Sequence, residues 1–112
     1  MQDITKGIAG HEGAGTVVAL GSDVEATGQW KVGDRAGIKW IANVCGHCEM
    51  CKDTSNGGEC MCLNQTNSGF TAQGTFQEYC LAPAKYATHI PDGVTDEQAG
   101  EWGDEARWLM LM

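Results

Sequence analysis

Apolar residues between Gly10 and Pro91 occur in short runs separated by glycine turns, a pattern that is typical of β-strands. The clearest run is the β-branched segment Thr16–Leu20, which ends at the turn residues Gly21 and Ser22. The same pattern predicts three further strands: Asp34–Ile41, Thr75–Leu81 and Lys85–Ile90. The polar stretch Val24–Gly33 is predicted to be a surface loop. The chain is therefore predicted to be mainly β.

Only the end of the chain has a helical pattern. Thr95 and Gln98 match a capping box, which predicts a short helix that Gly100 and Gly103 weaken. The last segment, Trp108–Met112, is apolar and is predicted to be a poorly covered tail. Its alternative interpretation is a contact surface for a partner.

Length and charge narrow the classes of function. A chain of 112 residues fits one domain, and its net charge of −8 would repel phosphate backbones, so we expect no nucleic-acid partner. No run approaches the roughly 20 apolar residues that cross a bilayer, and Met1–Gly10 is too polar for a signal peptide. We therefore expect no membrane partner and a cytoplasmic location. In that compartment six cysteines indicate metal or redox chemistry rather than disulfides.

Four cysteines have the spacing of a structural zinc site. Cys45, Cys48 and Cys51 are each separated by two residues, and Cys60 follows after a loop rich in glycine, serine and asparagine. Zinc in structural sites takes four tetrahedral ligands, and thiolates supply them without leaving a position open. The sequence predicts these four residues as zinc ligands, although Cys62 in place of Cys60 fits the spacing as well.

The remaining candidates near the cluster have simpler interpretations. Cys80, between Tyr79 and Leu81, is predicted to be a small buried hydrophobic residue. His47 lies among sulfur ligands and is predicted to be a solvent-facing loop residue.

A second segment with candidate chemistry is Gly10–Gly15, in which His11 and Glu12 stand between glycines. Taken alone, such a histidine is more often a hydrogen-bonded structural residue than a metal ligand. The glycines also suggest a dinucleotide-binding loop, with Asp34 about 20 residues later. We reject that interpretation, since Val18 replaces the third glycine and a strand is predicted where the helix should begin.

These motifs together resemble the zinc-dependent alcohol dehydrogenases of the medium-chain dehydrogenase/reductase superfamily. The resemblance covers about Ile8 to Gly100 and includes the double-spaced cysteines. It also includes a set of spaced glycines and their neighbours: Gly10-His11-Glu12, Gly15, Gly21, Val24 and Gly33-Asp34-Arg35. Two further segments look like the fungal and yeast-type branch: Gly37-Ile38-Lys39-Trp40 and Gly74-Thr75-Phe76-Gln77-Glu78-Tyr79.

The resemblance implies a fold and a site. It implies a GroES-like partial β-barrel over residues 1–100, with a structural-zinc lobe at about residues 43–62 and a divergent tail at residues 101–112. His11 matches a ligand of the catalytic zinc, Glu12 the carboxylate beside that metal, and Trp40 an aromatic residue of the alcohol pocket. The implied substrates are small alcohols or aldehydes, and NAD is the cofactor of the full-length family. A homo-oligomer is compatible with the resemblance.

Several family features have no match in this sequence. No cysteine precedes His11, none follows Cys80, and no Rossmann cofactor domain is present, so two cysteine ligands of the catalytic zinc are missing. Eight residues rather than the usual seven separate Cys51 from Cys60. The sequence therefore predicts a zinc-binding fragment of an alcohol dehydrogenase that is inactive alone, with a small zinc-binding interaction module as the alternative.

Overall fold

The computed structural model describes residues 7–99 and 105–112 of the chain. Its elements, in chain order, are β1 (Gly13–Leu20), α1 (Ser22–Thr27), β2 (Arg35–Ile38), β3 (Ile41–Asn43), α2 (Glu49–Lys52), η1 (Thr54–Asn56), η2 (Gly58–Met61), β4 (Thr66–Asn67), β5 (Tyr79–Ala82), β6 (Thr88–His89), α3 (Asp96–Ala99) and β7 (Glu105–Leu111). More of the described residues lie in strands than in helices, and the helices are short, so the mainly β prediction is confirmed.

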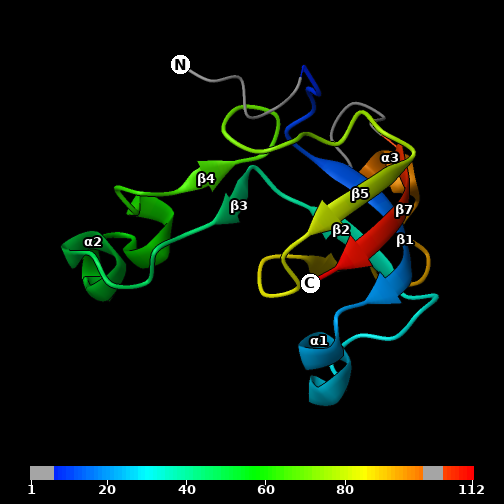
Figure 1. Cartoon of the computed structure of the whole chain (residues 1–112), viewed down its shortest axis with the longest axis horizontal. Coiled ribbons are helices and arrows are strands. Elements are labelled where there is room, and N and C mark those ends of the chain that lie inside the picture. The colour runs from blue at the N-terminus through cyan, green and yellow to red at the C-terminus, as the bar shows by residue number, and fades with distance from the viewer. Residues whose placement is uncertain (1–6, 100–104) are drawn as a thin grey trace.

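The main sheet has five strands in the order β5-β7-β1-β2-β6 (Figure 1). Strand β1 pairs antiparallel with β2, with Ala14 opposite Gly37, and β2 pairs antiparallel with β6. Strand β7 runs parallel to both β1 and β5 and lies between them. Over the described residues the sheet does not close into a barrel, in keeping with a partial GroES-like barrel.

The hydrophobic core is small and lies against this sheet. Its buried members are Val17, Val24, Trp30, Ala36, Cys80 and Ala82. Val17 and Ala36 are fully buried on neighbouring strands, and Trp30 is 5% exposed. Most of these side chains are small, so the core leaves space between elements, which matters for a pocket described below.

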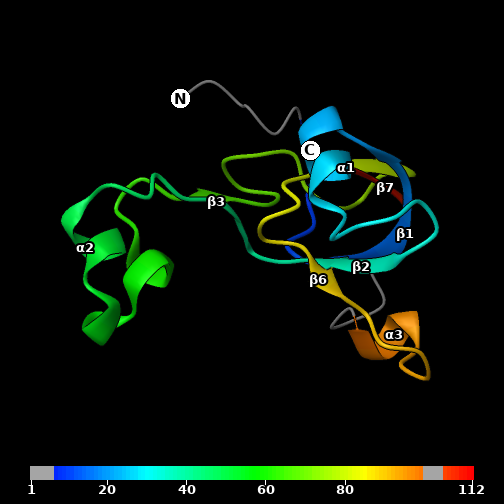
Figure 2. The ribbon, with the colours of Figure 1, turned by 90° about the horizontal axis from the view of Figure 1, so that it is seen from below.

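The two-stranded sheet β3–β4 connects the main sheet to a separate lobe. Residues 44–65, which we call the cysteine lobe, contain α2, η1 and η2. Figure 1 and Figure 2 show the lobe projecting from the rest of the molecule beyond β3 and β4. The chain enters and leaves the lobe through this one antiparallel pair, in which Ile41 faces Asn67.

Several predicted elements differ from those observed. The strand expected over Asp34–Ile41 divides into β2 and β3, with a break at Lys39 and Trp40. The loop expected over Val24–Gly33 is wrong for its first part, because α1 covers Ser22–Thr27, buries Val24 and ends at Gly28 in the left-handed region. The expected capping box of α3 is confirmed by reciprocal bonds, at 3.0 Å from the Thr95 amide to Gln98 and at 3.2 Å from the Gln98 amide to Thr95.

The C-terminal segment is a strand of the main sheet. The sequence predicts Trp108–Met112 to be a poorly covered tail, yet the structure includes residues 105–111 as β7, bonded to a neighbour on each edge. Met112 extends this pairing, since its amide donates to Ala82 and its carbonyl accepts from Ala84. The backbone of this segment is therefore not free for an edge-to-edge contact.

In the part of the chain that the structure describes, no helix has the length and apolar character needed to cross a membrane.

Candidate metal centre

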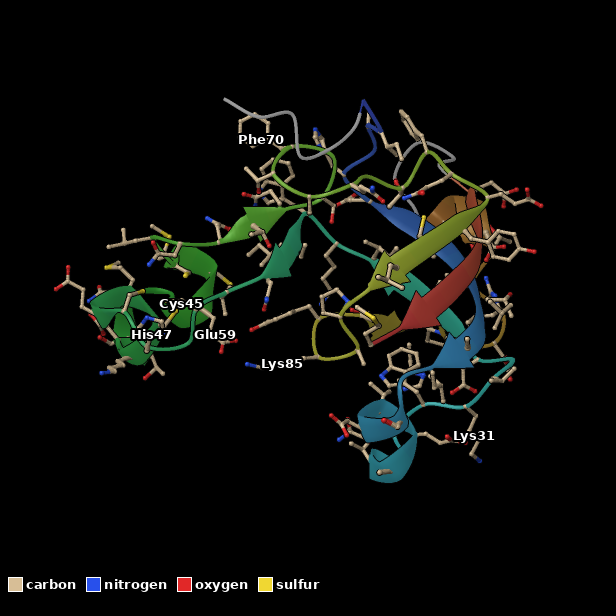
Figure 3. The ribbon with its side chains drawn as sticks, in the orientation of Figure 1. Lys31, Cys45, His47, Glu59, Phe70 and Lys85 are labelled. Atoms are coloured by element: carbon tan, nitrogen blue, oxygen red, sulfur yellow. The ribbon has the colours of Figure 1, made fainter. Side chains whose placement is uncertain are left out.

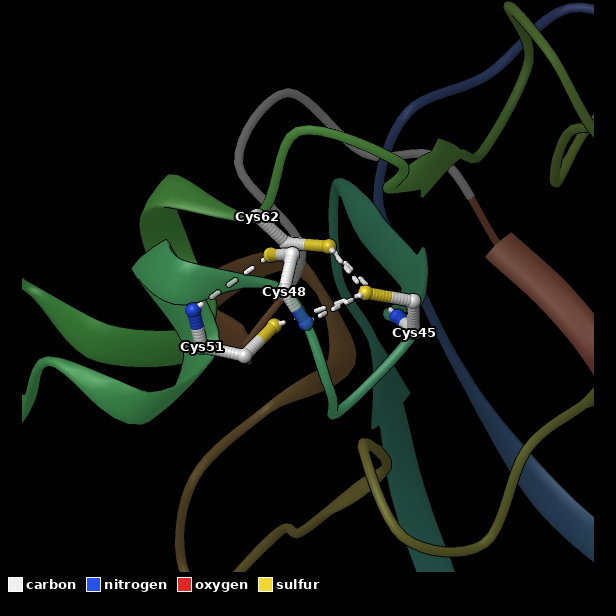
Figure 4. Close-up of side chains that lie close together, drawn as sticks. All are labelled: Cys45, Cys48, Cys51 and Cys62. Atoms are coloured by element: carbon white, nitrogen blue, oxygen red, sulfur yellow. Dashed lines mark hydrogen bonds between the residues drawn. The ribbon is translucent and has the colours of Figure 1, made fainter.

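Four cysteine side chains converge at the base of the cysteine lobe (Figure 4). Cys45 follows β3, Cys48 is the N-cap of α2, and Cys51 lies one turn later in that helix. Cys62 ends η2 on the return of the chain. The two-residue spacing brings the first three thiols together because the chain turns into α2 between them.

The geometry fits a tetrahedral metal ion. The four sulfur atoms lie within 4.8 Å of one another. The Cys45 Sγ atom is 3.6 Å from the Cys62 Sγ atom and 3.9 Å from the Cys51 Sγ atom. A tetrahedron with zinc–sulfur bonds of about 2.3 Å places its sulfurs about 3.8 Å apart. The cluster is therefore able to hold zinc with little rearrangement.

Backbone amides point at the sulfurs and favour their ionised form. The Cys48 amide donates to Cys45 Sγ at 3.4 Å, and the Cys51 amide donates to Cys48 Sγ at 3.5 Å. Amide donors at His47 and Cys48 lower the pKa of Cys45 to about 5, and donors at Leu63 and Cys51 lower that of Cys48. Desolvation instead raises the pKa of Cys51 to about 12, so this thiol holds its proton until a cation replaces it.

The fourth thiol of the cluster is Cys62, which corrects the predicted assignment of Cys60. The turn η2 covers Gly58–Met61 and directs Cys60 to solvent, whereas Cys62 is buried beside Cys45. The Cys62 Sγ atom also accepts amide hydrogens from Cys45 at 3.4 Å and Asn64 at 3.3 Å. The alternative that the spacing left open is the one that the structure adopts.

The two neighbouring predictions are confirmed. His47 is exposed and its Nδ1 atom lies 2.8 Å from the Cys45 carbonyl oxygen, outside the group of thiols. Cys80 is 1% exposed in β5, where burial raises its pKa to about 11, so it stays neutral. All six cysteines are free thiols, so the structure forms no disulfide framework.

The second candidate group begins with a tightly packed turn that places His11. A Cβ atom on Gly74 would meet the carbonyl oxygen of Ala9, and one on Gly69 would meet the backbone of Gly10 at 2.6 Å. The segment Ala9–Gly10 is thus held between two turns that only glycine permits to approach so closely. The Thr75 hydroxyl adds a bond of 2.5 Å to the carbonyl oxygen of Glu12.

His11 is exposed, and one of its ring nitrogens is held by a backbone carbonyl. Its Nδ1 atom lies 2.7 Å from the carbonyl oxygen of Ser68, and because a carbonyl only accepts, Nδ1 carries the proton. In the neutral ring the lone pair is then on Nε2, and a neutral imidazole with a free lone pair is the form that binds a metal ion. Ser68 is itself buried and fixed, since its hydroxyl donates to the Lys39 carbonyl at 2.9 Å.

Trp40 packs against this imidazole, and Phe70 in turn packs against Trp40. Trp40 meets the His11 ring edge-on, with ring centroids 4.6 Å apart, and Phe70 lies 6.1 Å from Trp40. Figure 3 shows Phe70 on the side of the molecule away from Lys31. The structure thus places the side chains of His11 and Trp40 in contact.

Glu12 has different neighbours from His11. It lines a cavity of about 470 Å³ together with Gly37, Thr88 and His89. Among the described residues, neither His11 nor Glu12 belongs to a group of three or more potential metal ligands; the cysteine cluster is such a group. Gly13, Ala14 and Gly15 lie within β1, so the rejected dinucleotide loop does not form.

The sequence analysis did not identify several residues whose contacts join segments that are distant in the sequence. Ser68 and Phe70 lie in the turn after β4 and reach His11 and Trp40 only because that turn packs against them. Glu59, in η2, binds Lys85 Nζ at 2.9 Å and the Tyr86 hydroxyl at 3.3 Å, joining the lobe to the main sheet (Figure 3). No local pattern marks contacts between residues so far apart in sequence.

Comparisons with known proteins agree with this architecture. Residues 3–92 match the family model described as the alcohol dehydrogenase GroES-like domain. Alcohol dehydrogenase 2 of Emericella nidulans is 50% identical over 92 residues, which are 82% of this chain and 24% of that protein. Alcohol dehydrogenases of Schizosaccharomyces pombe and Geobacillus stearothermophilus are 47% and 42% identical over the same share of this chain. The chain spans about a quarter of the length of these relatives.

Proposed function

Because the chain belongs to the GroES-like domain family of alcohol dehydrogenases, we propose that it is a zinc-binding part of an NAD-dependent zinc alcohol dehydrogenase. The reaction of the whole enzyme is the oxidation of a primary or secondary alcohol to an aldehyde or ketone by hydride transfer to NAD. The chain on its own binds zinc and does not turn over alcohol. The observation that carries the proposal is the cluster of four thiols at zinc-binding distances.

The cysteine cluster supports a structural role for the metal. Four thiolates fill the tetrahedron and leave no position for a substrate. Zinc there joins the segment after β3, helix α2 and the return of the chain at Cys62, which are otherwise connected in the lobe by short hydrogen-bonded turns. The donor set therefore supports folding of the lobe rather than chemistry.

The chain's contribution to the reaction centres on His11. Zinc bound at a catalytic site supplies Lewis-acid polarisation of the alcohol oxygen. The residues of this chain orient the imidazole: Ser68 holds Nδ1, and Trp40 packs against the ring and supplies an apolar wall for a small alcohol or aldehyde. Glu12 lies next to His11 in the chain, in the position of the carboxylate that the resemblance places beside the metal.

The surroundings of His11 also support the proposal that the chain alone is inactive. His11 lies outside any group of three potential ligands among the described residues, whereas catalytic zinc sites use three protein ligands. The free thiols of all six cysteines support a cytoplasmic location, and a homo-oligomer is compatible with this role.

The alternative function, a zinc-binding interaction module, gains no support from the observation on which it depended. It used Trp108–Met112 as the contact surface, and β7 has hydrogen-bonded neighbours on both edges.

Zinc per chain and alcohol oxidation together test the proposal. Elemental mass spectrometry of the purified protein should find about one zinc per chain, as expected for one four-thiolate site, and Cys48→Ser should remove it. Ethanol and NAD should give no NADH above background. No zinc in the unmodified chain would contradict the structural site, and about two zinc ions with NADH formation would contradict the inactivity.

A further inference from the structure

A pocket of about 270 Å³ lies between the main sheet and the β3–β4 pair. Its walls come from the end of β2, from β3, from β5 and from the turn after β5, with Ile38, Ile41, Cys80 and Tyr86 among the lining residues. None of the four clustered cysteines lines the pocket, and neither does His11 or Trp40, although Ser68, which bonds to His11, is one of the lining residues.

The pocket exists because its walls carry small side chains. Ala72, Ala82 and Ala87 line it, and a larger residue at any of these positions would enter its volume. The walls are also fixed in place. Ala82 is hydrogen-bonded to Met112, and the Tyr86 hydroxyl donates to Glu59 at 3.3 Å, which holds one aromatic ring in the wall.

The chemistry of the lining selects a neutral, apolar ligand. Among the residues that the structure describes, no aspartate or glutamate lines the pocket, and Lys39 is the only charged residue that does, although the sequence carries fifteen acidic residues. Cys80 is a neutral thiol there, because burial raises its pKa to about 11. Gln73 and Gln77 supply polar groups for one hydrogen bond from a ligand.

The volume sets the size of that ligand. An apolar cavity of about 150 Å³ holds one benzene ring, so 270 Å³ accommodates two fused rings. A ring face beside Tyr86 gains the favourable geometry of an aromatic pair.

We propose that this pocket binds a small neutral aromatic molecule of two fused rings, for which indole is the probe. This goes beyond the proposed function, since neither the four clustered cysteines nor His11, Glu12 and Trp40 line the pocket.

Protection of Cys80 from alkylation localises the binding. The zinc-loaded chain is treated with iodoacetamide with and without indole, and modification is followed by mass spectrometry of the peptides. Cys80 is 1% exposed, so its thiol is alkylated only when the fold opens transiently. Indole at a few millimolar should slow this alkylation at least about fivefold, as expected for a ligand of the closed form with a dissociation constant near 1 mM. Cys60 is exposed and lies outside the pocket, so its alkylation rate is the internal control and should not change.

A matched pair of variants completes the test. Ala87→Phe fills the pocket and should abolish protection, whereas Ala26→Phe, on the exposed face of α1, should leave it intact. Magnetisation transfer from indole to the Tyr86 ring in the unmodified chain provides evidence that does not depend on either variant folding. Equal slowing at Cys60 and Cys80, or no transfer to Tyr86, would overturn the proposal.

Discussion

Replacing Cys62 and Cys60 separately with serine distinguishes the structure from the sequence spacing. The two residues stand two positions apart, yet Cys62 is 3.6 Å from the Cys45 sulfur and Cys60 is exposed. We expect Cys62→Ser to weaken zinc binding strongly and Cys60→Ser to leave it unchanged.

The size of the effect follows from the number of ligands. Structural zinc sites bind with about 10–16 kcal/mol. Divided over four thiolates, this gives about 3 kcal/mol for each ligand, or a weakening of roughly 100-fold for the loss of one. Serine does not replace the thiolate, because its hydroxyl keeps its proton and oxygen is a poorer partner for zinc than sulfur at such a site.

Competition with a chromophoric zinc chelator measures the affinity, and cobalt substitution counts the sulfur ligands. The intensity of the sulfur-to-cobalt charge-transfer band should fall in Cys62→Ser and stay at its full value in Cys60→Ser. The Cys60→Ser variant also shows whether loss of any thiol from the lobe disturbs folding. If Cys60→Ser loses zinc and Cys62→Ser retains it, the placement of η2 is wrong.

Three further changes test the packing, the buried thiol and the helix cap. Gly74→Ala should lower the free energy of unfolding, measured by urea titration, by about 1–3 kcal/mol, since its Cβ meets the Ala9 carbonyl. The control Gly37→Ala, whose Cβ has no contact under 3.8 Å, should change the free energy of unfolding little. Equal decreases in the two variants would refute the argument. The Cys80 thiol has its pKa raised from 9.0 to about 11, so its contribution to stability is present below pH 9 and lost as the pH rises to about 11. The free energy of unfolding, measured against pH for the unmodified chain and for Cys80→Ala, should show this loss as a difference of up to about 3 kcal/mol between the two curves. Curves that stay parallel from pH 8 to 11 would contradict it. Thr95→Ala should destabilise helix α3 by about 1 kcal/mol, whereas Thr95→Ser, which keeps the hydroxyl, should change its stability little. Faster amide hydrogen exchange in α3 of Thr95→Ala would detect the difference. Unchanged exchange would mean that the cap does not stabilise the helix.

Local sequence predicts the elements whose causes are local. The glycine-bounded β-branched run became β1, and the capping box of α3 formed because both partners lie within four residues. Helix α1 was missed because the stretch is polar; Val24 becomes buried only when the helix packs against the core. The tail from Trp108 was misinterpreted because a strand's neighbours, here β1 and β5, lie far away in the sequence.

The candidate site divides in the same way. The spacing of Cys45, Cys48 and Cys51 is a property of one turn and its helix, so the sequence predicted their convergence. The choice between Cys60 and Cys62 depends on which way η2 turns, and spacing carries no information on that. The partner of His11, Ser68, lies 57 residues along the chain and could not be found locally.

The contact of Glu59 with Lys85 and Tyr86 gives the cysteine lobe a third attachment to the rest of the molecule, in addition to the two passages of the backbone. The hydrogen bond from Lys85 is the main cause of the lowered pKa of Glu59, so the carboxylate stays charged below its usual pH range. Lys85 is largely exposed, however, and dissolved salt screens such a pair. We therefore expect ionic strength to alter the freedom with which the lobe rotates about the β3–β4 ribbon, while the four thiols within it keep their arrangement.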